Sequence, residues 1–404
     1  MKGDASSHGW EAVPARTGQA MSRSLPRSWE AELGGYRLVF GAGSIDRIGE
    51  LVGELPGRRA LVVTDRGLRE AGHLSRAVES LQGAGIAPFV YDGVEESPTT
   101  RHVDEGTRVA LEHAVDCIVG LGGGSAMDCA KGINFLVSNG GRMEDYQGTG
   151  RATKPMLPSL GVPTTAGTGS EAQSYALIRR EASGSKMACG AKQAMFRRVV
   201  LDPALATTVP REVAGIAGID ALSHAVESYV SKPSNPVSRL FAREAWRLVA
   251  STLPLVLRDP GNIGAWGDML LGAHLAGAAI EQSMLGAAHA CANPLTARFP
   301  IAHGVAVGVM LPHVVRFNAT HVGSLYEELG RATVTDDPAG TLEERVRALR
   351  SGAGLPGSLR DCAVPRDCLS ELAVEAERQW TAAFNPRPLT RAEFLELYEA
   401  AHDG

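Results

Sequence analysis

Several common features are missing from the 404-residue sequence, and each absence narrows the class of protein. No stretch approaches about 18 consecutive apolar residues, so we expect no transmembrane helix. Residues 1–29 are polar, and they lack the apolar segment of a secretory signal, so we expect a disordered leader. No basic block stands out in a chain of net charge -5. Binding to nucleic acid or to an anionic membrane therefore has no compositional support.

Paired cysteines are also absent. None of the cysteines forms a C-x-x-C pair, and they are scattered over the chain: Cys117, Cys129, Cys189, Cys291, Cys362 and Cys368. This usage is typical of a reduced, cytoplasmic protein. We interpret all of them as small buried hydrophobic residues.

The length of the chain suits two domains, and the sequence pattern changes near residue 205. Before that point, helical patterns alternate with apolar, β-branched runs that we predict as strands at 36–40, 59–65, 87–92, 116–121 and 156–162. This alternation predicts an α/β domain with a parallel sheet, covered on both faces, over residues 30–207. Residues 208–404 carry Ala, Leu and charged residues at helical spacing, which predicts an all-α C-terminal domain.

A glycine-rich segment, GLGGGSAMDCAK, directly follows the strand expected at 116–121. Its glycines let the backbone approach a ligand closely, and a pyrophosphate at a helix N-terminus is stabilised by free N–H groups and the helix dipole. The S-x-x-D spacing predicts a capping box at the helix start. The candidate residues are Gly122, Gly123, Gly124, Ser125 and Asp128. Because the G-x-G-x-x-G fingerprint is absent, a simple strand-to-helix turn is the alternative.

Two further features favour a dinucleotide. The segment PTTAGTGSE combines glycines with Thr164, Thr165 and Thr168, whose hydroxyls suit phosphate oxygens or a nicotinamide amide. Asp65 ends the strand RALVVTD, where a carboxylate can accept hydrogen bonds from ribose hydroxyls and repel a 2′-phosphate. That reading favours NAD over NADP, and a helix cap is the alternative role for Asp65.

The C-terminal part contains a candidate metal site. Asp220 and His224 are four residues apart and share one face of a predicted helix, whereas His289 and His303 follow in later segments. Three imidazoles and one carboxylate suit Fe²⁺ or Zn²⁺. Gly304 would permit close packing beside His303. Spacing alone does not show that the segments converge, and two other histidines compete as ligands: His274 and His313.

These segments occur in a characteristic order: GGGS-x-x-D-x-x-K, PTT-x-GTGSE, D-x-x-x-H-A-x-E and H-x(13)-HG. In this respect the sequence resembles the iron-containing (group III) alcohol dehydrogenase family over residues 30–400. The resemblance implies an architecture shared with dehydroquinate synthase, a homo-oligomer, and a metal held by Asp220, His224, His289 and His303. It also implies a pyrophosphate at Gly122–Ser125, the three threonines near the phosphates and nicotinamide, Asp65 near the ribose, and Lys186 near the nicotinamide ribose.

One position departs from the family pattern. Many members carry a histidine four residues after the third ligand, and this chain has Asn293 there. Because Asn does not titrate, a proton relay through this position is excluded, and we expect altered proton delivery or substrate contact. Glu227 is a candidate partner of a metal ligand. Arg298 would suit an anionic substrate such as a phosphonate or carboxylate aldehyde, although a charge at the surface or at the domain interface is the favoured interpretation.

The resulting hypothesis is an NAD(H)- and metal-dependent oxidoreductase of small alcohols or aldehydes, with the metal as a Lewis acid. Two alternatives differ in what they predict. A cyclase or lyase similar to dehydroquinate synthase would recycle NAD within one turnover and produce no net NADH. A non-catalytic paralogue would bind nucleotide and metal without turnover.

Overall fold

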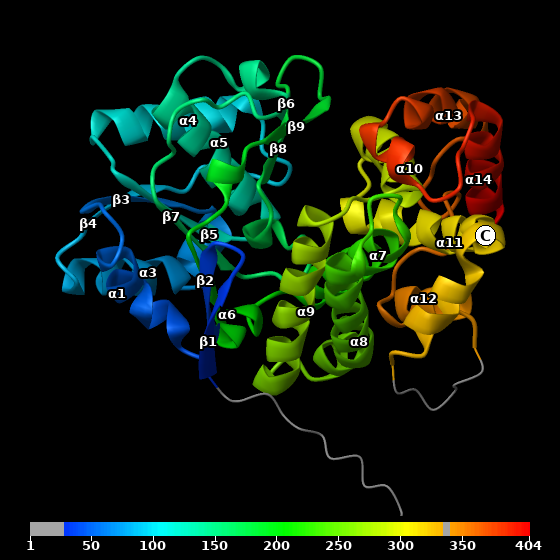
Figure 1. Cartoon of the computed structure of the whole chain (residues 1–404), viewed down its shortest axis with the longest axis horizontal. Helices are drawn as coiled ribbons and strands as arrows, with labels where there is room; N and C mark the ends of the chain where they lie inside the picture. The colour runs from blue at the N-terminus through cyan, green and yellow to red at the C-terminus, as the bar shows by residue number, and fades with distance from the viewer. Residues whose placement is uncertain (1–27, 334–339) are drawn as a thin grey trace, which may run out of the picture.

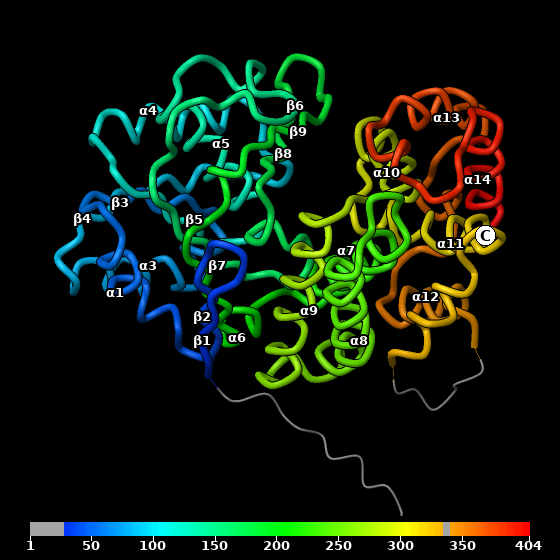
Figure 2. Tube along the Cα trace, viewed as in Figure 1, coloured from blue at the N-terminus to red at the C-terminus, as the bar shows by residue number. Residues whose placement is uncertain are grey.

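A computed structural model describes residues 28–333 and 340–404 of the chain. Figure 1 shows the N-terminal part, blue to green, as a sheet with helices on both faces, and the C-terminal part as a group of helices beside it. The tube in Figure 2 follows the same path. The expected α/β domain followed by a helical domain is therefore confirmed. All of the leader up to residue 27 lies outside the described residues.

Seven strands form the main sheet, in the order β1-β2-β10-β7-β5-β3-β4. They are β1 (Ser28–Leu33), β2 (Tyr36–Gly41), β3 (Arg59–Val63), β4 (Ala87–Tyr91), β5 (Cys117–Gly122), β7 (Ser159–Pro163) and β10 (Arg198–Leu201). All neighbouring pairs are parallel except β1 with β2. The sequence predicted β2, β3, β4, β5 and β7. It missed β10 and β1, whose first residues, Ser28 and Trp29, had been assigned to the leader.

Side chains of β3 alternate between the two faces of the sheet, as a strand requires. Leu61 and Val63 join the core on the side of α4 and α5, whereas Ala60 and Val62 join the core on the side of α1 and α3. The helices of this domain are α1 (Ile48–Gly53), α2 (Arg66–Glu70), α3 (His73–Gly83), α4 (Thr100–Glu112), α5 (Gly124–Asn139) and α6 (Pro203–Ala206). The sheet is thus covered on both faces, as predicted.

A second sheet of three strands lies in the same domain, and the sequence analysis did not predict it. Its order is β6-β9-β8, and its strands are β6 (Gly148–Thr149), β8 (Tyr175–Arg179) and β9 (Lys186–Gly190). β8 and β9 form an antiparallel hairpin. Charged and small residues interrupt the apolar pattern here, because the hairpin is only partly buried.

The C-terminal domain contains no strand within its described residues, in agreement with the prediction. Its helices are α7 (Arg211–Val230), α8 (Pro236–Arg258), α9 (Ile263–Glu281), α10 (Ala287–Arg298), α11 (His303–Gly330), α12 (Leu342–Gly352), α13 (Leu369–Glu377) and α14 (Arg391–Asp403). They share one core that includes the fully buried Trp246 and Trp266.

By length and composition, α9 is the one helix of the described residues that is apolar enough to cross a membrane. However, 72% of its most apolar window is buried inside the protein. It packs against α7 and α8, which explains the apolar composition as that of a core helix.

All six cysteines are free. Cys117, Cys129, Cys189 and Cys291 are buried, which confirms their interpretation as small hydrophobic residues. The interpretation is wrong for Cys362, in a turn, and for Cys368, at the N-cap of α13, because both are only partly buried.

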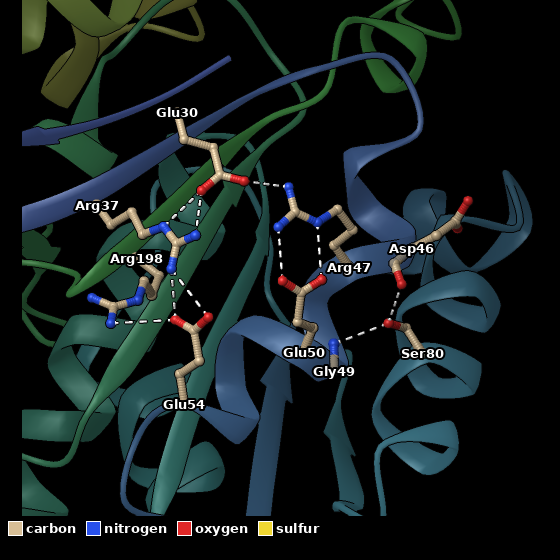
Figure 3. Close-up of polar contacts among 9 residues, drawn as sticks. All are labelled: Glu30, Arg37, Asp46, Arg47, Gly49, Glu50, Glu54, Ser80 and Arg198. Carbon is tan, nitrogen blue, oxygen red and sulfur yellow. Dashed lines mark hydrogen bonds and ion pairs between the residues drawn. The ribbon is translucent and has the colours of Figure 1, made fainter. Parts of the chain in front are cut away.

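A network of ion pairs secures the edge of the main sheet (Figure 3). Glu30 of β1 accepts hydrogen bonds from Arg37 of β2 and from Arg47, and Arg47 also bonds to Glu50 of α1. Arg37 continues the network to Glu54, 2.8 Å away. Exposed pairs contribute about 0–1 kcal/mol each, but several shared charges hold the short edge strand in register.

Candidate metal and cofactor site

Four side chains of metal-ligating type converge where three helices meet. Asp220 and His224 lie one turn apart on α7, His289 lies in the first turn of α10, and His303 begins α11. The Nε2 atoms lie 3.6 Å (His224), 3.9 Å (His289) and 3.9 Å (His303) from Oδ1 of Asp220. The segments that the sequence could not place relative to one another are therefore brought together.

The residues of this cluster fit a divalent metal ion. Oδ1 of Asp220 and Nε2 of His289 are buried and have no hydrogen-bond partner in the part of the chain that the structure describes. An unsatisfied buried polar group costs about 1–3 kcal/mol, which a bound cation would offset. Burial lowers the pKa of His224, and it lowers that of His303 well below the usual value. Both imidazoles therefore stay neutral, which is the form that ligates a metal.

Glu227 fixes the orientation of the His289 ring by bonding to its Nδ1 atom. Its Oε2 accepts a 2.5 Å hydrogen bond from Nδ1 of His289, and its Oε1 accepts a 2.7 Å bond from the backbone N–H of Ala288. The carboxylate thus fixes the ring so that Nε2 faces Asp220. A carboxylate behind a ligating histidine is the usual arrangement around metal sites.

Close packing of α11 on α7 depends on Gly304. A Cβ at this position would lie 2.3 Å from the carbonyl oxygen of Ile216, so only glycine lets His303 approach Asp220. The expectation for Gly304 is confirmed.

The two competing histidines lie elsewhere. His274 of α9 bonds through Nε2 to the Tyr36 hydroxyl (2.7 Å) and through Nδ1 to Glu171 (3.1 Å). It therefore joins the two domains rather than the cluster around Asp220. His313 of α11 is buried, and neither of its ring nitrogens has a partner among the described residues.

The glycine-rich segment forms the turn from β5 to α5, but the expected capping box is wrong. α5 begins at Gly124, with Gly123 as an N-cap that makes no side-chain cap bond. Ser125 instead accepts a 3.3 Å bond from the backbone N–H of Ser97, and Asp128 accepts a 2.6 Å bond from the Ser170 hydroxyl. Because the helix starts at Gly124, Ser125 lies inside its first turn rather than at the N-cap position. The N-terminal N–H groups of α5 are thus left without a side-chain cap.

The threonine-rich segment lies directly against this turn. A Cβ on Gly124 would lie 2.5 Å from the methyl group of Thr168, so glycine is required for the contact. On the other side, Gly169 (φ +58°) touches α9, where a Cβ on Gly277 would lie 2.1 Å from the Gly169 carbonyl oxygen. The segment is therefore clamped between α5 and α9.

Lys131 also ties this segment to α5. Its buried ammonium donates to the carbonyl and hydroxyl oxygens of Ser170 (2.6 and 2.9 Å) and to the Tyr175 carbonyl (2.7 Å). Asp128 lies 3.9 Å away and neutralises the charge. Burial lowers the pKa of Lys131 and raises that of Asp128, and each group opposes the shift of the other.

A cavity of about 370 Å³ brings the two groups of residues together. Its lining includes Asp220, His224, His289 and His303, together with Gly123, Gly124, Ser125, Asp128, Thr165, Thr168 and Lys186. A second cavity of about 400 Å³ shares Gly123, Ser125 and Thr165 with the first, adds Thr164, and reaches Asp65. The two form one path along the carboxyl ends of the strands.

Asp65 occupies the far end of this path. Its Oδ1 accepts a 3.0 Å bond from the backbone N–H of Leu68, which caps α2. The helix-cap role is therefore confirmed. The second oxygen would lie 3.4 Å from a Cβ on Gly122, so the carboxylate also faces the glycine-rich turn.

Asn293 and Arg298 lie outside the 370 Å³ cavity. Asn293 is one turn after His289 on α10, and its Nδ2 donates to Gln379 over 3.2 Å. Arg298 bonds to Glu371 (2.7 Å) and Glu375 (3.0 Å), which agrees with the favoured interpretation as a surface charge.

Sequence reasoning missed the loop that carries Glu96 and Ser97, both of which line the path. Ser97 has φ +56°, a rare conformation for a residue other than glycine. A strained backbone at a cavity wall often marks a functional position. The only signal in the sequence is the turn-forming Ser-Pro pair at residues 97 and 98.

Two family models match nearly the whole described chain. The model of the iron-containing alcohol dehydrogenase matches residues 36–203, and that of the C-terminal region of the Fe-containing alcohol dehydrogenase family matches residues 215–402. Together they span both domains. The second contains Asp220, His224, His289 and His303, which we call the metal-type cluster.

Comparisons with individual proteins and with solved structures point to the same family as the two family models. The 1,3-propanediol dehydrogenase of Citrobacter freundii is 34% identical over 371 residues, covering 90% of this chain and 96% of that protein. Lactaldehyde reductase of Escherichia coli (strain K12) is 31% identical over 372 residues, covering 90% and 97%. The crystal structure of a 1,3-propanediol oxidoreductase superimposes with a TM-score of 0.87 at 32% identity, covering 90% of this chain and 97% of that one.

A sulfoacetaldehyde reductase from Bifidobacterium kashiwanohense, solved in complex with NAD+, superimposes with a TM-score of 0.82 at 26% identity, covering 92% and 98%. The chain therefore belongs to the iron-containing alcohol dehydrogenase family, and it is an NAD-dependent oxidoreductase of alcohols or aldehydes.

Proposed function

We propose that the chain binds one divalent ion, Fe²⁺ or Zn²⁺, through Asp220, His224, His289 and His303, and transfers hydride between NAD(H) and a small alcohol or aldehyde. The observation that carries this proposal is the 370 Å³ cavity, whose lining includes both the metal-type cluster and the glycine-rich turn. A reaction between a cofactor and a metal-held substrate requires both groups to face one enclosed space.

When bound, the metal supplies a Lewis acid for the substrate oxygen, and NAD(H) supplies or accepts the hydride. Residues of the chain orient both the metal and the cofactor. Gly122–Ser125 and the uncapped N-terminus of α5 receive the pyrophosphate, and the hydroxyls of Thr164, Thr165 and Thr168 contact the phosphates and the nicotinamide. Asp65 binds the adenosine ribose and disfavours a 2′-phosphate, so NAD is preferred to NADP.

Lys186 of β9 lies between the two groups and contacts the nicotinamide ribose in this proposal. Its charge acts on both Asp220 and His303, which supports a position close to the reacting atoms. Asn293 carries no titratable proton, so the proton must reach the substrate by another route.

The test is a metal-reconstitution assay. The full chain is stripped with a chelator, reloaded with Fe²⁺ or Zn²⁺, and followed at 340 nm with NADH and a panel of small aldehydes; bound metal is counted in parallel. We expect NADH consumption that returns with about one metal ion per chain and is lost in His289→Ala. Bound metal and NAD+ with no net NADH turnover would instead favour the cyclase or the binding protein.

A further inference from the structure

A third cavity, of about 420 Å³, lies beside the metal-type cluster and is lined by residues of both domains. It shares Ser97 and Lys186 with the 370 Å³ cavity, so the two cavities adjoin at these residues. Asn293, one turn after His289 on α10, also lines it. The third cavity is therefore within reach of a substrate that reacts beside the cluster.

Most of the charged residues that line the third cavity are cationic. Its wall contains four cationic residues, Arg179, Lys186, Arg298 and Arg378, and a single acidic residue, Glu375. This concentration of positive charge contrasts with the net charge of -5 of the whole chain. A cleft lined by one sign of charge raises the local concentration of ligands of opposite charge.

Apart from Arg298, these cationic residues form no direct ion pair with the part of the chain that the structure describes. Arg298 is paired with Glu371 and Glu375, and its guanidinium is therefore not available to bind an anionic ligand. Arg179, Lys186 and Arg378 form no ion pair within residues 28–333 and 340–404. Arg179 is held in place by a 2.9 Å bond from Nε to the Gly184 carbonyl, which leaves its terminal nitrogens for a ligand. Arg378 is solvent-exposed on the opposite wall, at the end of α13.

We propose that Arg179 and Arg378 bind the negatively charged end of the substrate, which is a small aldehyde carrying a carboxylate, sulfonate or phosphonate. This inference rests on the proposed function. Hydride from NADH and one proton from solvent convert the aldehyde to the corresponding anionic alcohol and release NAD+. A guanidinium and a carboxylate, sulfonate or phosphonate form charge-assisted hydrogen bonds, which are the strong class of such bonds.

The test compares succinate semialdehyde with its methyl ester, which has nearly the same shape but no charge. For the metal-loaded wild type we expect kcat/KM to favour the anion by about tenfold, equivalent to one charge-assisted contact. Arg378→Gln should remove most of that preference by raising KM for the anion, with kcat and the ester unchanged. Arg378→Lys should restore part of it. Arg258→Gln is the control, because Arg258 is exposed and lines none of the three cavities.

Equal use of both substrates by the wild type, or equal losses on both in Arg378→Gln, would overturn the proposal. Calorimetric titration of the NAD+-loaded protein with succinate measures binding to the anion site directly, without turnover. Binding that weakens about tenfold in Arg378→Gln supports the anion site, whereas unchanged or undetectable binding refutes it. Turnover of the ester without an anion preference would leave the proposed function standing, and loss of all metal-dependent turnover would contradict the proposed function separately.

Discussion

Glu227 and His289 form a buried 2.5 Å hydrogen bond that joins α7 to α10 directly behind the metal-type cluster. The same carboxylate caps Ala288, so one side chain sets both the start of α10 and the orientation of the imidazole. In a glutamine at position 227 an NH2 group replaces one of the two oxygens, so at the observed geometry one of the two N–H donors would face another donor.

Glu227→Gln should therefore weaken metal binding about 10–100-fold without removing a ligand. The measurement is competition for the metal against a chelator of known affinity. Glu244→Gln is the matched control and should leave the affinity unchanged, because Glu244 is a partly exposed residue of α8 whose carboxylate bonds to Arg247. If Glu227→Gln bound metal as tightly as the wild type, the carboxylate would have no role in holding His289 for the metal.

Asp65 is expected to set the choice between NAD and NADP. Asp65→Asn keeps a good N-cap for α2 but removes the negative charge that repels a 2′-phosphate. We expect kcat/KM for NADPH to rise about tenfold while that for NADH falls, at unchanged thermal stability. Parallel changes for both cofactors would contradict this role and leave Asp65 as a helix cap alone.

Gly277 is expected to control the cofactor site from the other domain. In Gly277→Ala the new methyl group would meet the Gly169 carbonyl at 2.1 Å, so the threonine-rich segment must move. We expect KM for NADH to rise severalfold and stability to fall by about 1–3 kcal/mol, the usual cost of overpacking. Gly330→Ala is the control, because its Cβ meets no atom of the described chain within 4 Å. Unchanged NADH kinetics in Gly277→Ala would show that the segment does not depend on this contact.

Asn293 offers a test of proton delivery. Asn293→His introduces a group that titrates near pH 6.5 one turn after His289. We expect a new limb in the pH profile of kcat near that value, absent from the wild type and from Asn293→Ala. The measurement is kcat between pH 5 and 9 with saturating NADH. An identical profile in all three proteins would exclude proton transfer through position 293.

The buried pair of Lys131 and Asp128 should show strong coupling. Lys131→Met leaves Asp128 buried without its cation, and we expect a loss of about 3–5 kcal/mol in the free energy of unfolding. The double variant with Asp128→Asn should lose less than the sum of the two single variants, by about 0.5–3 kcal/mol. Urea unfolding of all four proteins measures the cycle. Additive losses would mean that Ser170 and the Tyr175 carbonyl, rather than Asp128, satisfy the ammonium.

Local patterns were enough to predict much of the molecule. Apolar runs predicted five of the seven strands in the main sheet. Four of them, β2, β3, β5 and β7, are largely buried, whereas the edge strand β4 is only partly buried but still consists of apolar residues. Helical spacing placed Asp220 and His224 one turn apart, which follows directly from 3.6 residues per turn. β1 escaped prediction because an exposed edge strand next to a polar leader has little apolar pattern, and the hairpin of β8 and β9 escaped for the same reason.

The sequence by itself thus determined the order of the two domains, the glycine-rich turn and the types of residue available to a metal, since these depend on neighbours along the chain. Tertiary structure alone decided that α10 and α11 bring His289 and His303 to Asp220. It also paired Arg298 with glutamates, left Arg378 without an ion pair among the described residues, and left no room for a side chain at position 277. Such contacts join residues far apart in sequence, so packing of whole helices, and no local pattern, specifies them.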